Sequence, residues 1–138
     1  MEASILTSTK KILGLTEDDE SFDTDIITHI NSTLSTLTQI GVGPANGFFI
    51  EDSSTEWAEF IGDDNVLNMV RSYVFLKVRM LFDPPTTSFM IEAMNKQIEE
   101  YEFRISSHRE WMLDPVDPKI TREEANRGYH GDYGYPVF

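Results

Sequence analysis

The stretch from residue 63 to residue 83 most constrains what this chain can fold into. Apolar residues recur there at helical spacing and cover a face that is too wide for a helix with one neighbour. We therefore expect a central helix packed on more than one side, with Asp63 as its N-cap. It should end before Pro84, because proline disfavours helical geometry in the residue that precedes it. The core residues expected from this helix are Leu67, Val70, Val74, Val78 and Leu81.

Three further helical patterns accompany this segment. A short amphipathic pattern covers residues 4–13, and a longer one covers residues 23–40 and stops at glycines. A long helix is expected from about residue 88 to residue 109, with one buried stripe that alternates between three- and four-residue steps. The stripe comprises Ile91, Met94, Ile98, Tyr101 and Ile105. The patterns predict an all-α fold: a single small bundle of three main helices plus a short N-terminal one within residues 1–110, followed by an extended C-terminal tail at 111–138.

Residues 44–62 are expected to form a loop with some structure of its own. The segment 48–50 suits a short strand, and the segment 55–61 suits either one helical turn or a second strand. We expect Trp57 and Phe60 to cap the edge of the core. A long insertion in a compact domain is often functional, although a lid over the bundle explains it equally well.

The negative charge of the chain lies almost wholly in its first half. Of a net charge of −13, twelve acids and no Lys or Arg fall between Lys11 and Arg71, so the remaining residues sum to −1. This distribution argues against polyanion binding by the first half, because phosphate contacts need cations. It favours either a basic partner or a solvated surface that promotes solubility. The acidic residues that this surface would present to a basic partner are Glu17, Asp18, Asp19, Glu20, Glu51 and Asp52.

The C-terminal tail alternates glycine with aromatic residues from position 128 onward. Such segments suit adaptable contact surfaces that become ordered on binding. We favour a docking role over a tail that folds back on its own bundle, because the helical pattern is already complete at residue 109. The residues expected to dock are Trp111, Tyr129, His130, Tyr133, Tyr135 and Phe138.

Sequence motifs for catalysis or cofactor binding are absent. The chain has no cysteine, and no phosphate loop, nucleophile elbow or zinc-protease motif occurs. The acidic run at 17–25 lacks the glycine and the final Glu of a calcium loop. We therefore expect no enzyme activity, no cofactor and no metal, with a carboxylate- or metal-based hydrolase as a remote alternative. No secretory signal is expected, because the N-terminus lacks a basic stretch followed by an apolar run. No membrane span is expected either, because the central helix carries Arg71, Lys77 and Arg79.

The order of several short motifs resembles a known family. These motifs are Leu13-Gly14-Leu15, Phe22-Asp23, the helix end at 37–42, the Trp57 loop, Tyr73 to Arg79, Phe82-Asp83-Pro84-Pro85, and Glu99 to Arg104. In this order they resemble the head–tail connector proteins of tailed phages, which are also described as adaptor, head-completion or DNA-packaging proteins. The resemblance covers residues 4–110 and leaves the tail unmatched.

The resemblance implies a structural role without catalysis. It implies a homo-oligomeric ring, twelve-fold in the family, between the portal and the stopper or tail-completion protein. The tail would dock on the portal, and DNA would pass through the ring without specific binding. The acidic residues named above would then face the lumen of the ring or a basic partner. Such a protein would occupy the head–tail interface of the virion, and the host cytoplasm during assembly. The alternative that the charge distribution leaves open is an acidic helical module that captures one basic protein in a one-to-one complex.

Overall fold

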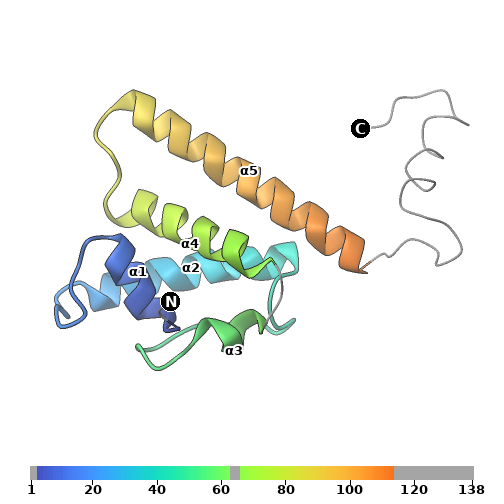
Figure 1. The fold of residues 1–138 in the computed structure, drawn as a ribbon, viewed down its shortest axis with the longest axis horizontal. Coiled ribbons are helices and arrows are strands. Elements are labelled where there is room, and N and C mark those ends of the chain that lie inside the picture. Colours follow the sequence, from blue (N-terminus) through green and yellow to red (C-terminus); the bar gives the residue numbers. More distant parts are fainter. Residues whose placement is uncertain (1–2, 63–65, 114–138) are drawn as a thin grey trace, which may run out of the picture.

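A computed structural model of the chain describes residues 3–62 and 66–113, with side chains as far as residue 108. The described residues form helices without a strand, which confirms the predicted all-α fold (Figure 1). The helices are α1 (Ile5–Ile12), α2 (Asp23–Ile40), α3 (Trp57–Ile61), α4 (Leu67–Phe82) and α5 (Ser88–Leu113). The last helix therefore continues three residues beyond the boundary expected at residue 110.

Helix α4 is the central element, as predicted. It packs against α2 on one side and α5 on the other, and α1 contacts both α2 and α4. Figure 1 shows α4 and α5 as an antiparallel hairpin, with the segment that carries α3 running along the opposite side of the bundle. The bundle therefore has two distinct ends, one at the α4–α5 turn and one at the segment before α3.

The helix ends follow from local sequence. Ser4 caps α1 by accepting a hydrogen bond from the N–H of Thr7 at 3.2 Å. Gly41 ends α2 in the left-handed region at φ 104°, which glycine adopts without steric cost. Helix α4 begins only at Leu67, after an N-cap at Val66, so the expected N-cap at Asp63 is wrong. Helical stability comes mainly from packing of the apolar face, and Val66, directly before the helix, is buried.

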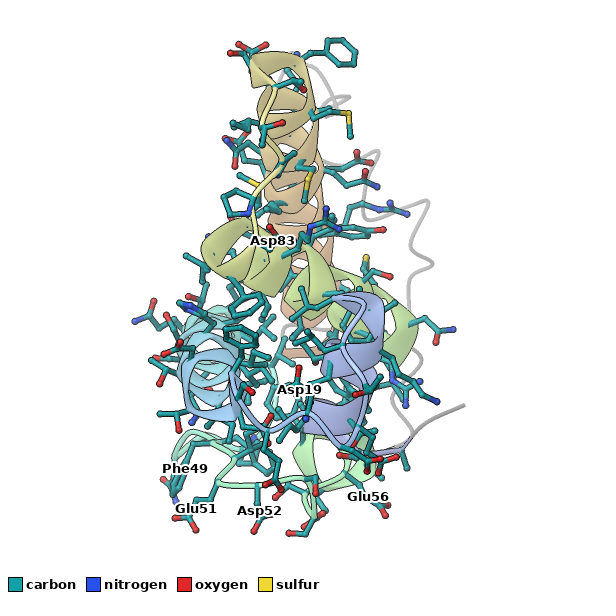
Figure 2. All side chains as sticks on the ribbon, turned by 90° about the vertical axis from the view of Figure 1, so that its left-hand side faces the viewer. Asp19, Phe49, Glu51, Asp52, Glu56 and Asp83 are labelled. Carbon is teal, nitrogen blue, oxygen red and sulfur yellow. The ribbon has the colours of Figure 1, made fainter. Side chains whose placement is uncertain are left out.

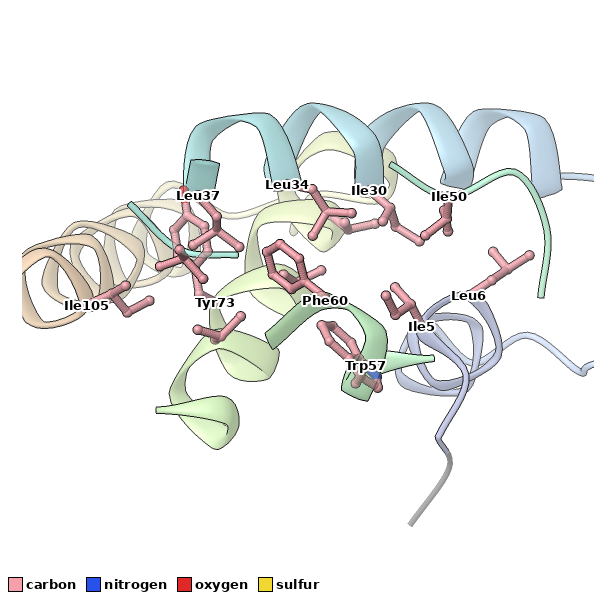
Figure 3. Packing of buried hydrophobic residues seen from close by; sticks show 14 of the residues in the cluster. Ile5, Leu6, Ile30, Leu34, Leu37, Ile50, Trp57, Phe60, Tyr73 and Ile105 are labelled. Carbon is pink, nitrogen blue, oxygen red and sulfur yellow. The ribbon is translucent and has the colours of Figure 1, made fainter. Parts of the chain in front are cut away.

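Trp57 and Phe60 lie inside the core and not at its edge, where we had expected them. The side chain of Trp57 is 1% exposed, and its indole N–H donates to Ser8 Oγ at 2.9 Å. Figure 3 shows both rings in the buried cluster that also holds Ile5 of α1 and Leu34 of α2. A buried indole needs a partner for its N–H. Ser8 supplies that partner, and this explains how the ring can occupy the centre.

The segment 48–50 does not form a strand. Its backbone is irregular, and the region's one bridge is an isolated antiparallel pair of Ser4 with Glu56. The ring of Phe48 instead packs on Phe60, with centroids 5.1 Å apart. The second expected element is a short helix, α3, and not a strand.

The central helix supplies most of the core residues predicted for it. Val70, Val74 and Val78 are buried, and Leu67 is partly buried against the same cluster. Leu81 is 46% exposed, so its assignment to the core is wrong. Leu81 lies in the last turn on a side that faces solvent, whereas its neighbours Met80 and Phe82 pack against the core.

Candidate protein-binding surfaces

The segment before α3 presents an acidic surface that we call the acidic end, formed by Glu51, Asp52, Glu56 and Glu59. All four side chains are exposed, and residues 44–62 contain no Lys or Arg. Figure 2 shows Glu51, Asp52 and Glu56 projecting from one end of the molecule together with Phe49. The ring of Phe49 is 66% exposed. An exposed aromatic ring beside charged side chains can serve as an anchor for a protein partner.

Hydrogen bonds hold the acidic end to α2. The side chain of Asn31 donates to the carbonyl of Ile50 at 3.0 Å and accepts from its N–H at 2.7 Å. Ile50 itself is buried. The backbone on either side of Ile50 is thus fixed, and Phe49 and Glu51 are directed outward by the same anchor.

The acidic end is also joined to the start of α1. The N–H of Ile5 donates to the carbonyl of Thr55 at 3.1 Å, and the N–H of Trp57 donates to the carbonyl of Ala3 at 2.9 Å. Ser4 Oγ adds a hydrogen bond to the carbonyl of Ser53 at 2.7 Å. These contacts link positions about 50 residues apart in the chain, so the acidic end is a built part of the bundle.

The acidic run at 17–20 lies apart from the acidic end, in the loop that joins α1 to α2. Asp19 is labelled in this loop in Figure 2, away from Glu51 and Asp52. The buried side chain of Lys10 pairs with Asp23 at 2.8 Å and donates to the carbonyl of Glu17 at 3.1 Å. Lys10 is therefore a structural cation that fixes the loop. Glu17, Asp18 and Glu20 remain exposed and Asp19 is partly exposed.

The carboxylates of Asp19 and Asp52 are stabilised in the charged form by short-range hydrogen bonds. Bonds from the hydroxyl and N–H of Ser54 lower the pKa of Asp52. Bonds from Ser21 lower the pKa of Asp19 in the same way. Both carboxylates keep their negative charge to more acidic pH than a free aspartate does.

A second exposed surface lies where α4 turns into α5, and we call it the hairpin tip. Its exposed apolar side chains are Leu81, Phe89 and Met90, which are 46%, 77% and 47% exposed. Figure 2 shows the start of α5 at the opposite end of the molecule from the acidic end. The molecule thus exposes an apolar surface and an acidic surface at opposite ends.

The predicted stripe of α5 is buried only in its second half. Ile98 and Ile105 are buried and Tyr101 packs against the core, whereas Ile91 and Met94 stay partly exposed and outside the core cluster. The second half of α5 is fixed by a hydrogen bond from Tyr73 to Glu102 at 2.7 Å. The assignment of Ile91 and Met94 to the core is therefore wrong, since both are only partly buried and neither belongs to the core cluster.

The predicted docking residues of the tail lie outside the described residues. These are Tyr129, His130, Tyr133, Tyr135 and Phe138. The backbone of Trp111 belongs to α5, and its side chain is outside the described part of the chain. The docking role of the tail therefore stays a prediction.

Sequence reasoning did not single out the hairpin tip or Phe49 as surface features. Their residue types fit a core as well as a surface, and only the packing of the bundle separates the two. The excess of apolar residues in the first turn of α5, Phe89 to Ile91, was the available signal.

The described residues offer little for chemistry. Among them no group of three or more His, Asp or Glu side chains could hold a metal ion. His29 contacts the ring of Phe82 edge-on, with centroids 6.5 Å apart, and so acts in packing. No helix in the described ranges is long and apolar enough to cross a membrane.

Exposed apolar side chains at one end of a small helical bundle and an acidic surface at the other are features of proteins that bind other proteins. The family comparison agrees with this class. The family model described as phage connector protein matches residues 5–111, so the chain belongs to the phage connector protein family. No curated protein and no solved structure matches the chain. Membership indicates a virion-associated head–tail connector of a structural family.

Proposed function

We propose that this chain forms a homo-oligomeric ring, of the twelve-fold type, between the portal and the stopper or tail-completion protein of a tailed phage. The observation that carries the proposal is the family match over residues 5–111. Exposed surfaces at two ends of one small bundle support it, since each subunit of a connector must contact several neighbours at once.

In this proposal DNA passes through the ring without specific binding. The first half of the chain supports that role, because its long interval without Lys or Arg offers no cations for phosphate. Carboxylates along a channel would repel the DNA backbone and let it pass. The exposed residues available for the lumen are Glu17, Asp18, Asp19 and Glu20 of the α1–α2 loop.

The tail is proposed to dock on the portal during assembly in the host cytoplasm. Its aromatic residues, spaced by glycines, supply large contact area on an adaptable backbone. Segments that order only on binding can wrap a partner at modest affinity per unit area. Repetition around a ring would then add many such contacts together.

A truncation tests this division of the chain. Removal of residues 114–138 cuts directly after α5 and leaves every described packing contact in place. We expect unchanged helical circular dichroism and thermal unfolding, with loss of co-sedimentation with the portal. A second variant keeps the full-length chain and replaces Tyr129, Tyr133, Tyr135 and Phe138 by Ser. This variant should also lose portal binding. A truncated chain that unfolds would show instead that the tail folds back on the bundle.

The second candidate is an acidic module that captures one basic protein. The observation that favours it is the acidic end, with exposed Phe49 beside Glu51 and Asp52. A one-to-one complex with a basic partner, seen by native mass spectrometry without any larger assembly, would support this candidate over the ring.

A further inference from the structure

We infer that the turn at Asn46 and Gly47 is a site of spontaneous deamidation, which converts the Asn46 amide into a carboxylate. The product adds a negative charge to the segment that carries the acidic end. The reaction needs only this turn and water, so it is independent of the ring proposed above.

The residue after Asn46 is the one that least obstructs this chemistry. Deamidation begins when the backbone nitrogen of the following residue attacks the side-chain carbonyl carbon of asparagine. A side chain on the following residue hinders that approach, whereas glycine has no Cβ and the widest backbone freedom. Asn46 is the one asparagine of the chain that precedes a glycine.

The side chain of Asn46 is available to react. It is exposed, and no hydrogen bond within the described part of the chain holds its amide. Asn31 offers the contrast, because its amide both donates to and accepts from the backbone of Ile50. A Cβ built on Gly47 would meet nothing within 4 Å, so neighbouring atoms do not crowd the residue that supplies the attacking nitrogen.

One hydrogen bond restrains the attacking nitrogen. The N–H of Gly47 donates to the carbonyl of Pro44 at 2.9 Å, and Gly47 lies in the left-handed region at φ 95°. This bond must open before the nitrogen can lose its proton and attack. Residues 44–46 are all exposed, and exposed turns open at a small cost in free energy. The turn can therefore react without unfolding of the bundle.

The steps balance without an oxidant or a reductant. The nitrogen of Gly47 forms a bond to Cγ of Asn46, the bond from Cγ to Nδ2 breaks, and ammonia leaves with the proton that the nitrogen lost. The product is a succinimide ring. Water then gives its hydroxyl to one ring carbonyl and a proton to the nitrogen, and the new acid ionises. Attack at Cγ yields aspartate, and attack at the main-chain carbonyl yields isoaspartate.

Both products change the surface beside the core. The charge of residues 44–62 goes from −4 to −5, and no Lys or Arg in that segment offsets it. Isoaspartate also lengthens the main chain by one carbon between Val42, which is buried, and Phe48, whose ring packs on Phe60. In a virion-associated protein, which is not renewed after assembly, these products would accumulate with the age of the particle.

Peptide mapping by tandem mass spectrometry measures the reaction. The full-length protein is incubated at mildly alkaline pH in water labelled with heavy oxygen and is then digested in ordinary water. Label in a new carboxylate at position 46 shows that the group formed during the incubation. Asn95, exposed on α5, is the internal control. Asn46 should gain label about tenfold faster than Asn95, because the helical backbone at Asn95 must open first.

Asn46→Gln is the matched variant. Its side chain is one carbon longer and would have to close a larger ring, and the exposed position tolerates the change. The aged wild type should separate by anion exchange into the parent species and a more acidic one. The aged variant should lack the acidic species.

The same incubation in urea reports the reaction of the unfolded chain. Label at Asn46 in the native protein, ahead of label at Asn95, supports deamidation of the folded turn. Absence of label at Asn46, or label there in urea alone, overturns the inference, since the fold would then protect the site. Equal labelling of Asn46 and Asn95, or an acidic species that persists in Asn46→Gln, also overturns it.

Discussion

Single side chains join parts of this molecule that are distant in sequence, and Trp57 is the most connected of them. Its ring packs edge-on against Phe75 with centroids 5.9 Å apart, and the guanidinium of Arg71 lies 5.4 Å from its ring centroid. Its N–H reaches Ser8 in α1. One residue of the segment before α4 thus couples α1 to α4.

Replacement of Trp57 should therefore destabilise the whole bundle. Trp57→Ala is expected to lower the free energy of unfolding by about 3–5 kcal/mol, the usual cost of removing a large buried ring. Urea unfolding followed by far-ultraviolet circular dichroism measures this. Phe49→Ala, at an exposed position in the same segment, is the control and should change stability by no more than about 0.5 kcal/mol. Similar effects at both positions would contradict the placement of Trp57 at the centre.

The hydrogen bond of Tyr73 to Glu102 is the polar contact that fixes α5 to α4. Tyr73→Phe leaves the Glu102 carboxylate without this donor, and should lower the free energy of unfolding by about 1–2 kcal/mol at neutral pH. Tyr101→Phe, at a partly buried position on α5, is the comparison variant. Equal losses for the two variants would argue against a special role of the hydrogen bond.

The same contact predicts a dependence on alkaline pH. Burial and then the hydrogen bond to Glu102 raise the pKa of Tyr73 above its ordinary value. The native state thus favours the protonated phenol, so its contribution to stability is complete below about pH 10 and is lost as the pH rises further. The stability of the wild type should fall more steeply above pH 10 than that of Tyr73→Phe. If the stability of the two proteins falls equally with pH, ionisation of Tyr73 is not the cause of the loss.

At the scale of helices, the periodic patterns of the sequence were good predictors wherever both sides of a helix are packed. Helix α2 begins at Asp23 and ends at Ile40 as expected, because a polar first turn and a glycine mark its ends. The pattern of α5 was equally regular, but Ile91 and Met94 in its first half are only partly buried and lie outside the core cluster. Periodicity shows which face of a helix is apolar. It does not show whether the covering partner is the same chain.

The segment before α3 was predicted less well, since irregular backbone leaves no periodic signal. Its position depends on long-range hydrogen bonds such as those of Asn31 with Ile50. Local sequence cannot reveal these bonds. The acidic character of the two loops was read correctly from sequence, whereas their separation in space and the exposure of Phe49 required the fold.

Asn31 gives the prediction that belongs to this scale. Asn31→Leu removes both hydrogen bonds to Ile50 and should cost about 2 kcal/mol. Hydrogen exchange at the amide of Ile50 should accelerate, because the acidic end would open locally. Ser35→Ala, one turn further along α2 at an exposed position, is the control and should leave that amide protected. Unchanged exchange with Asn31→Leu would show that the anchor lies elsewhere.

At the scale of the whole molecule, the charge is distributed unevenly, with −12 between Lys11 and Arg71 and −1 elsewhere. Binding of a partner to the acidic half should weaken as salt rises from about 0.1 M to about 1 M, because the screening length falls from about 10 Å to about 3 Å. Binding of the aromatic tail to the portal should change less over the same range. Sedimentation at several salt concentrations compares the two, and equal sensitivity would contradict this division of roles.

The most direct test of the ring is single-particle imaging of the purified full-length protein over a range of concentrations, alone and mixed with its portal. The proposed function predicts closed rings in at least one of the two samples, seated on the portal in the mixture. Particles that remain monomeric even with the portal present would contradict it.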